Sequence, residues 1–324
     1  MTPGNPRIVV AGAGAVGSVI GGLLAGAGSQ VTLVGREPHM SAIARDGLDV
    51  SGVFGTVHVH VRTATDLGLL DEPFDLALVT VKSHATEEVA ATLARWRSRP
   101  RGVVSLQNGL GNVEALGRAL GAERVLGARV IFGAVLAAPG RAVVTVNAQP
   151  VAIGPPGRPA SPDLARAAER LAALLAGAGI PAEPVADIEP VLWEKVLYNC
   201  GLNPLGALHG LSYGEVASTP GLRAELDRAI EEGFRVAQAA GVNLSWPDAQ
   251  GYLRHFHARL LPPTAAHHSS MRQDLEAGRK TEIDAINGAI VRAGARLGIA
   301  TPVHAELVRA VRAAEARRQD PGRG

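Results

Sequence analysis

The feature that most constrains the fold is a glycine-rich loop near the amino terminus, Gly-Ala-Gly-Ala-Val-Gly at residues 12–17. A β-type run at 7–11 precedes this G-x-G-x-x-G sequence, and a helical pattern at 15–27 and a second β-type run at 30–34 follow it. In this context the glycines permit a tight turn and let a pyrophosphate approach backbone N–H groups at the helix N-terminus. The loop therefore predicts a nucleotide-binding Rossmann unit. The residues expected at the cofactor are Gly12, Gly14, Ala15, Val16 and Gly17.

Two other interpretations of this stretch must be weighed. Residues 8–28 form 21 positions without a charge, which is long enough for a membrane-spanning helix, and Arg7 could begin a signal peptide. Seven glycines in the stretch and the strand–loop–helix–strand context argue against both. We therefore expect no membrane association.

The residues after the second β-type run bear on the choice of cofactor. NAD-preferring sites usually place a carboxylate there, which binds the ribose hydroxyls and repels a 2′-phosphate. Here the run ends in Val34-Gly35-Arg36, and a guanidinium can hold a phosphate in a bidentate manner. Glu37 follows and could bind the ribose instead. The sequence favours NADPH, with Arg36 as the phosphate ligand.

Composition excludes several classes of protein. The 324 residues suit two domains, and the formal net charge of +2 with no basic stripe argues against nucleic-acid binding. The single cysteine, Cys200, excludes an intramolecular disulfide framework and suits a reducing compartment, so we expect a cytoplasmic protein. The apolar surroundings of Cys200 predict a buried small hydrophobe and not a nucleophile.

Periodicity predicts how the rest of the chain is organised. Up to residue 186, β-type and helical patterns alternate, and after residue 188 only helical patterns follow. The expected strands and extended pieces are 75–81, 102–106, 124–133, 142–153 and 182–186; the expected helices are 85–96, 112–120, 163–178, 190–200, 222–240, 247–260, 282–297 and 304–317. The fold class is therefore α/β, with an N-terminal doubly wound Rossmann sheet in residues 1–186 and an all-helical domain in 187–324. We expect the active site in the cleft between them.

Lysine usage singles out one residue of the second half. Of the 32 basic residues, 29 are arginines and three are lysines, so a lysine is retained where a proton can be released near neutral pH. Lys195, Asn199 and Asn203 recur every four residues and would share one face of a helix. The alternative is a solvated stripe, with Asn203 capping the helix before Pro204. We favour a functional face.

Two further polar residues follow apolar strands. Lys82 and Asn108 each come after a β-type run, and ligands of open α/β sheets lie beyond the carboxyl ends of the strands. Asn108 could equally be the turn residue of an Asn-Gly pair.

Three segments have plain structural explanations. Thr281 could be an N-cap, with Glu282 and Asp284 as favourable acids in the first helical turn. Ser269 and Ser270 could cap a helix that begins at Met271. The histidines in the segment from His255 to His268 lack a metal-ligand spacing, so we expect no metal site.

In combination and in order, these motifs resemble the ketopantoate reductases, the NADPH-dependent 2-dehydropantoate 2-reductases. The resemblance covers nearly the whole chain. It rests on residues 12–17, Arg36, 81–82, 108–109, 193–195, 199–200, 203–204, 269–271, Asp274, 281–284 and 286–288.

The resemblance implies a role for each matching residue. Lys195 would donate a proton to the carbonyl oxygen as hydride arrives, and Glu282 would hold that lysine and the substrate hydroxyl. The residues implied to bind substrate are Asn108, Asn199, Asn203 and Ser270. Asn108 would also lie beside the nicotinamide, and Lys82 beside the phosphate or ribose of the cofactor.

We therefore expect NADPH-dependent reduction of 2-dehydropantoate to pantoate, a step of pantothenate and coenzyme A biosynthesis. Reduction of another 2-keto acid is the nearest alternative, and a non-catalytic NADP-sensing protein is a second. Ala-rich helices in the second half could form a homodimer face or pack within one chain. The resemblance does not explain the segment from His255 to His268.

Overall fold

The computed structural model describes residues 5–70, 72–157 and 161–319. The described residues form two compact units. The first unit comprises the described residues within 1–107 and 112–189, and the second comprises those within 108–111 and 190–324. The short segment 108–111 thus belongs to the second unit, although the first unit contains the residues on either side of it.

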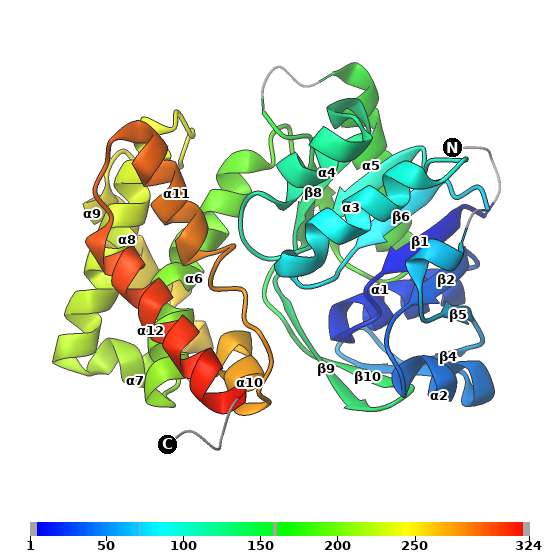
Figure 1. Cartoon of the computed structure of the whole chain (residues 1–324), viewed down its shortest axis with the longest axis horizontal. Coiled ribbons are helices and arrows are strands. Elements are labelled where there is room, and N and C mark those ends of the chain that lie inside the picture. Colours follow the sequence, from blue (N-terminus) through cyan, green and yellow to red (C-terminus); the bar gives the residue numbers. More distant parts are fainter. Residues whose placement is uncertain (1–4, 71, 158–160, 320–324) are drawn as a thin grey trace. The chain divides into compact units, whose positions relative to one another are not determined.

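The main feature of the first unit is a sheet of eight described strands (Figure 1). Their order is β12-β11-β8-β7-β6-β1-β2-β5, and every pair is parallel except β8 with β11. The strands are β1 (Arg7–Ala11), β2 (Gln30–Val34), β5 (Arg62–Ala64), β6 (Leu76–Val79), β7 (Gly102–Ser105), β8 (Val125–Arg129), β11 (Val151–Gly154) and β12 (Ala182–Pro184). The order reverses between β1 and β6, which confirms the predicted doubly wound sheet.

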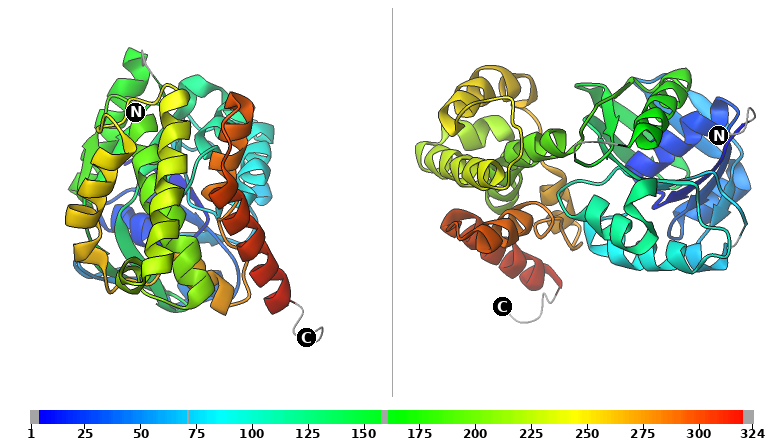
Figure 2. Two further views of the ribbon diagram at one scale, coloured as in Figure 1. Left: turned by 90° about the vertical axis from the view of Figure 1, so that its left-hand side faces the viewer. Right: turned by 90° about the horizontal axis from the view of Figure 1, so that it is seen from above.

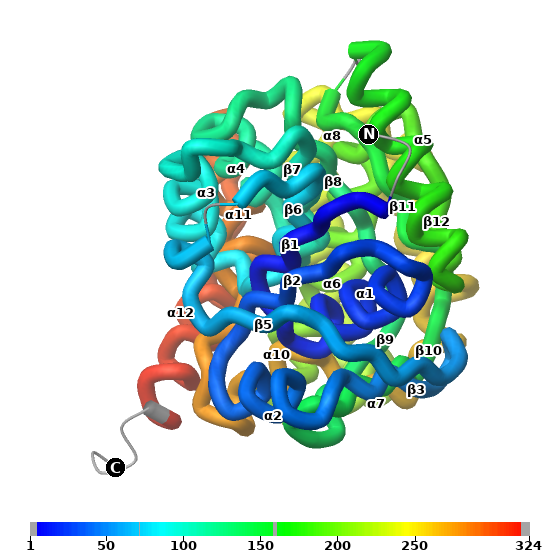
Figure 3. Tube along the Cα trace, turned by 90° about the vertical axis from the view of Figure 1, so that its right-hand side faces the viewer, coloured from blue at the N-terminus to red at the C-terminus, as the bar shows by residue number. Residues whose placement is uncertain are grey.

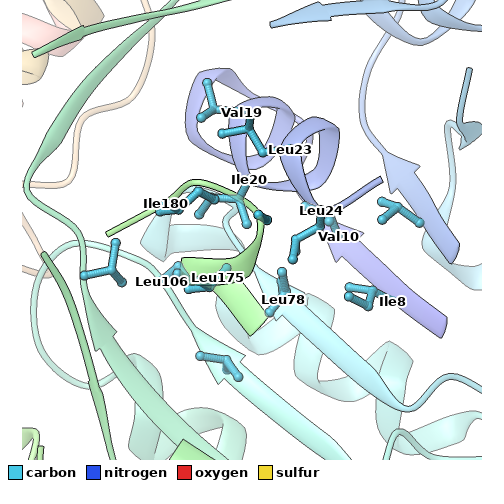
Figure 4. Packing of buried hydrophobic residues seen from close by; sticks show 14 of the residues in the cluster. Ile8, Val10, Val19, Ile20, Leu23, Leu24, Leu78, Leu106, Leu175 and Ile180 are labelled. Carbon is cyan, nitrogen blue, oxygen red and sulfur yellow. The ribbon is translucent and has the colours of Figure 1, made fainter. Parts of the chain in front are cut away.

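Helices cover both faces of this sheet. Helix α1 (Ala15–Gly26) contacts α5 (Pro162–Gly177), and α3 (Thr86–Arg95) contacts α4 (Asn112–Leu120). Figure 3 shows the two pairs on opposite faces. Side chains of α1 and of the strands form one buried cluster, shown in Figure 4. Because both faces are covered, the central strands β1 and β6 are apolar except for Arg7 at the start of β1.

A second, smaller sheet was not predicted. Its four described strands have the order β4-β3-β10-β9, and they are β3 (Leu48–Gly52), β4 (Val57–Val59), β9 (Phe132–Ala138) and β10 (Arg141–Asn147). The extended piece expected at 142–153 is therefore wrong as one element, because it divides into β10 of this sheet and β11 of the main sheet. Helix α2 (His39–Asp46) leads into β3 and was also missed.

The second unit is helical in its described residues (Figure 2). Its helices are α6 (Glu189–His209), α7 (Tyr213–Ser218), α8 (Pro220–Ala239), α9 (Ala249–His255), a π-helical turn (Phe256–Leu260), α10 (Ser270–Glu276), α11 (Asn287–Leu297) and α12 (Pro302–Gln319). Short 3-10 turns lie at Leu67–Leu69, Ser83–Ala85 and Ala122–Arg124 in the first unit and at Pro262–Thr264 in the second. The unit has its own hydrophobic core, and the predicted all-helical region is confirmed. Within the described ranges, no helix has both the length and the apolar character that crossing a membrane requires.

Two predicted helix boundaries are wrong. The helix expected at 190–200 continues through Pro204 to His209, so Asn203 does not cap it. The helix expected from residue 282 begins only at Asn287. Thr281 is therefore not its N-cap; the Thr281 hydroxyl instead accepts a hydrogen bond from the Ile283 N–H at 3.2 Å in the turn before the helix.

Candidate active site

Two positions in the glycine loop of the first unit have no room for a side chain. Gly12 has a φ of +111°, and a Cβ at this position would lie 2.4 Å from the Val81 nitrogen. A Cβ on Gly17 would lie 2.4 Å from the Gly12 carbonyl oxygen. Both positions therefore require glycine, because any side chain would force neighbouring backbone apart.

Gly14 serves a different purpose from Gly12 and Gly17. It is the N-cap of α1, and its missing side chain gives the helix no capping hydrogen bond. A Cβ on Gly14 would meet no atom within 4 Å, so the space beside the first helical N–H groups is open. Such N–H groups, together with the helix dipole, favour an anion at this end of α1.

Thr80 fixes the position of this loop, and sequence reasoning missed it. Its hydroxyl donates a hydrogen bond to the Gly12 carbonyl oxygen at 2.7 Å. Because Thr80 follows β6 and Gly12 follows β1, the bond joins the ends of the two strands at which the order of the sheet reverses. A threonine at the end of an apolar strand was the only signal available in the sequence.

Arg36 and Glu37 differ in their surroundings. Arg36 is exposed, two residues after β2 ends at Val34. The Glu37 carboxylate accepts a hydrogen bond from the Ser41 N–H at 3.2 Å, in the first turn of α2. Glu37 is therefore engaged at the start of that helix, a favourable place for a carboxylate.

A polar network underlies the segment that contains Lys82. The Gln107 amide donates hydrogen bonds to the Val81 carbonyl oxygen at 2.9 Å and to the Thr86 hydroxyl at 2.7 Å, and Gln107 accepts one from Ser105. Lys82 is half-buried and immediately precedes the 3-10 turn at Ser83–Ala85. The network ties the residues after β6 to those after β7. Sequence reasoning missed Gln107 because nothing local marks its distant partners.

In the second unit, Asn108 links the two residues expected to be catalytic. Its side-chain oxygen accepts a hydrogen bond from the Lys195 ammonium group at 2.6 Å, and its side-chain nitrogen donates one to the Glu282 carboxylate at 3.2 Å. The exposed fraction of Glu282 is 7%. The geometry thus brings together three residues that lie far apart in the sequence.

Gly109 explains how Asn108 reaches Glu282. It has a φ of +85°, and a Cβ on it would lie 2.4 Å from the Ala285 carbonyl oxygen. The same oxygen accepts a hydrogen bond from the Leu110 N–H at 2.9 Å. The Asn-Gly pair lies in a bend of the backbone that packs against Ala285, and this contact carries Asn108 to Glu282.

Asn199 and Asn203 are buried on α6, one and two turns after Lys195. The side-chain oxygen of Asn203 accepts a hydrogen bond from the Tyr213 hydroxyl at 2.6 Å. Burial raises the pKa of Tyr213, which keeps the phenol protonated and able to donate. In the described part of the chain, neither the side chain of Asn199 nor the side-chain nitrogen of Asn203 has a hydrogen-bond partner. Tyr213 was not predicted.

The two serines before α10 have different environments. Ser269 is fully buried; its hydroxyl donates to the Asn203 carbonyl oxygen at 3.3 Å and accepts from the Arg272 N–H at 3.1 Å. Ser269 is therefore the N-cap of α10, as one interpretation held. Ser270, the serine expected to bind substrate, is exposed at the start of the same helix.

Cys200 and the histidine segment have structural partners. Cys200 is fully buried, as predicted, and burial raises the pKa of its thiol. His257 contacts the Asp227 carboxylate at 2.7 Å, and His268 contacts the Arg272 guanidinium at 2.7 Å. Within the residues that the structure covers, no three His, Cys, Asp or Glu side chains are arranged to hold a metal ion.

Comparison with known proteins decides the family. Residues 8–157 match a family model described as ketopantoate reductase PanE/ApbA, and residues 187–315 match its C-terminal counterpart. A 2-dehydropantoate 2-reductase from Halobacterium salinarum is 37% identical over 311 residues, covering 95% of this chain and 99% of the relative. The chain belongs to the ketopantoate reductase family. It is accordingly a member of an oxidoreductase family.

Solved structures agree with this assignment. A PanE/ApbA family ketopantoate reductase from Ralstonia eutropha JMP134 has a TM-score of 0.84 and 33% identity, covering 97% of this chain and 99% of its own. The ternary structure of a D-mandelate dehydrogenase with NADH and anilino(oxo)acetate has a TM-score of 0.85 and 25% identity. The match covers 96% of this chain and 99% of that chain. The fold of the ketopantoate reductases thus occurs in a protein that has a different named substrate.

Proposed function

We propose that this chain reduces 2-dehydropantoate to pantoate with NADPH, and that Lys195 is the proton donor. The observation that carries the proposal is the contact of Asn108 with both Lys195 and Glu282. It brings the Lys195 ammonium group, the Asn108 amide and the Glu282 carboxylate together in the second unit. Asn199 and Asn203 lie on the same helix as Lys195. Names of relatives support the substrate, since curated proteins at 30–37% identity are called 2-dehydropantoate 2-reductases.

The first unit has residues that fit a dinucleotide phosphate. The open space beside Gly14 and the uncapped N-terminus of α1 would accept the pyrophosphate, with Gly12, Ala15, Val16 and Gly17 forming the rest of the turn. Exposed Arg36 would hold the 2′-phosphate, because Glu37 is engaged by the Ser41 N–H. Lys82 would lie on the phosphate or ribose side, and Asn108 beside the nicotinamide. When bound, NADPH supplies the hydride.

The chain's own residues manage the proton and the charge. As the carbonyl carbon of the substrate gains a hydride, negative charge develops on its oxygen, and a nearby ammonium group stabilises that charge. Lys195 then transfers a proton from its side-chain nitrogen to this oxygen, which becomes the hydroxyl of the product. Lys195 is left neutral and regains a proton from solvent before the next turnover.

The remaining residues orient the lysine and the substrate. Asn108 holds the lysine nitrogen at 2.6 Å, and we propose that Glu282 binds the substrate hydroxyl. We propose that Asn199, Asn203 and Ser270 bind the hydroxyl and carboxylate groups. The side-chain nitrogen of Asn203 is suited to this role, because Tyr213 already occupies its oxygen.

The test is turnover of NADPH with a panel of 2-keto acids. We expect the highest kcat/KM with 2-dehydropantoate. The structural likeness to a D-mandelate dehydrogenase favours 2-oxo-2-phenylacetate, the keto acid of mandelate, as the second substrate to try, with NADH beside NADPH. Preference for that acid would refute the substrate assignment. Tight NADPH binding with no turnover of any acid would favour a sensing protein.

A further inference from the structure

Helix α6 contains a proline where a helix normally cannot hold one. Pro204 has no N–H, so the carbonyl oxygen of residue 200, four positions earlier, loses its helical hydrogen bond. Cys200 is fully buried, so its carbonyl lies away from bulk solvent. A buried carbonyl without a partner would cost about 1–3 kcal/mol. The helix nevertheless continues for five residues beyond Pro204.

Asn287 supplies the missing donor. Its side-chain nitrogen lies 2.7 Å from the Cys200 carbonyl oxygen and donates a hydrogen bond to it. The same nitrogen donates to the Nδ1 atom of His304 at 3.1 Å, and His304 donates from Nε2 to the Ala229 carbonyl oxygen at 2.9 Å. Asn287 and His304 are both fully buried. Because both of its neighbours are acceptors, the Asn287 amide can present only its nitrogen to them.

The lost helical hydrogen bond lies within the face of α6 that carries the proposed active-site residues. Lys195 precedes Cys200 on this helix, and Asn203 immediately precedes Pro204. Asn199 lies next to Cys200, the residue whose carbonyl is released. The direction of the second part of α6 relative to the first therefore determines where Asn203 lies with respect to Lys195.

We propose that Asn287 is a positioning residue for the reduction: its hydrogen bond to the Cys200 carbonyl replaces the one that Pro204 removes and fixes the course of α6 between Lys195 and Asn203. The role rests on the proposed function. Asn287 acts through the helix backbone, whereas Lys195 acts on the substrate itself.

The test is a double-mutant cycle between Pro204 and Asn287. Pro204→Ala restores an N–H that can serve the Cys200 carbonyl, so Asn287→Ala should destabilise the chain much less in that background. We expect Asn287→Ala alone to lower the melting temperature by about 3 °C or more. In the Pro204→Ala background we expect less than half of that shift.

Kinetics distinguish positioning from plain stabilisation. Each single variant is assayed well below its melting temperature, with rates normalised to NADPH-binding sites so that only folded protein counts. We expect kcat/KM for the keto acid to fall about 10- to 100-fold in both Asn287→Ala and Pro204→Ala, with the Kd for NADPH unchanged. The Pro204→Ala result is the sharper one, because this variant keeps the carbonyl hydrogen-bonded and yet removes the proline ring that crowds the helix backbone at residue 200.

Pro220 provides the matched control. It stands at the first position of α8, where an N–H has no helical partner to serve. Pro220→Ala should leave kcat/KM unchanged and add independently to Asn287→Ala in the melting experiment. Equal destabilisation by Asn287→Ala with and without the Pro204→Ala change, or wild-type kcat/KM in Pro204→Ala, would overturn the positioning role. Absence of turnover in the unaltered chain would instead overturn the proposed function, and the melting cycle would still report on the Asn287 hydrogen bond.

Discussion

His304 offers a prediction about stability that depends on a single buried ring. The side chain is fully buried, donates to the Ala229 carbonyl oxygen and accepts from Asn287. Burial lowers its pKa to about 4 from the usual 6.5, and the hydrogen bond to Ala229 offsets only part of that shift. The folded chain therefore holds His304 neutral at pH values where the unfolded chain has already protonated it.

The sign and size of the effect follow from proton linkage. Between pH 6.5 and about 4 the unfolded state binds more protons at His304 than the folded state, so the free energy of unfolding falls as the pH falls. The contribution of neutral His304 to the free energy of unfolding is complete above pH 6.5 and is lost progressively as the pH falls to about 4. The full shift corresponds to about 3 kcal/mol, of which about 2 kcal/mol should be lost between pH 7.5 and pH 5.

The assay is urea unfolding at these two pH values, with and without His304→Gln. Glutamine can still donate one hydrogen bond and accept another, but it does not titrate. The loss of stability in acid that other titratable groups cause is therefore the same in both proteins and cancels in the comparison. Trp193 and Trp246 lie in the second unit and Trp96 in the first, so a Trp96→Phe background makes fluorescence report on the unit that contains His304. We expect the unaltered chain to lose about 2 kcal/mol more than the glutamine variant. The same loss in both would refute the reasoning.

Three predictions concern the proposed reaction. Lys195→Ala should lower kcat about 10²- to 10⁴-fold, the range for loss of a general acid, and an unchanged rate would remove Lys195 from the mechanism. Arg36→Asp should raise the KM for NADPH and move preference toward NADH, because a carboxylate repels a 2′-phosphate; unaltered preference in a two-cofactor assay would exclude the phosphate contact. Gly12→Ala should abolish NADPH binding in a fluorescence titration while the second unit still unfolds cooperatively, because its Cβ would lie 2.4 Å from the Val81 nitrogen; tight binding by this variant would contradict the loop geometry.

Much of the first unit was predictable because its signals are local. The central strands β1 and β6 are almost wholly apolar since both faces of the sheet are covered, and the glycine loop has a defined spacing. The second sheet was missed because two of its strands, β3 and β4, are short and only partly buried, so the longer β9 and β10 had no recognisable partners in the sequence. In β3, buried Leu48 and Val50 alternate with partly exposed Asp49 and Ser51, and nothing in so short a run separates a strand from a loop.

The wrong and missing predictions in the second unit depend on partners far away in the sequence. A proline within a helical pattern normally indicates where the helix ends, but α6 continues through Pro204. The Cys200 carbonyl receives a hydrogen bond from Asn287 in place of the lost one, and this donor could not be recognised because it lies 87 positions away in the sequence. Likewise, the place of Asn108 at the end of a strand was readable, but its contacts with Lys195 and Glu282 were not. Periodicity describes what a segment prefers alone, and these contacts come from tertiary structure.

The assignment of residues 108–111 to the helical unit has a consequence for dissecting the molecule. A fragment that begins at residue 190 would contain Lys195 and Glu282 but lack Asn108, which touches both. The Ala285 carbonyl oxygen would also lose its hydrogen bond from the Leu110 N–H, and the close packing of Gly109 against Ala285 would be lost. The helical half is thus not a separable module: its proposed proton-donating cluster is completed by four residues that the chain supplies from within the sequence of the first unit.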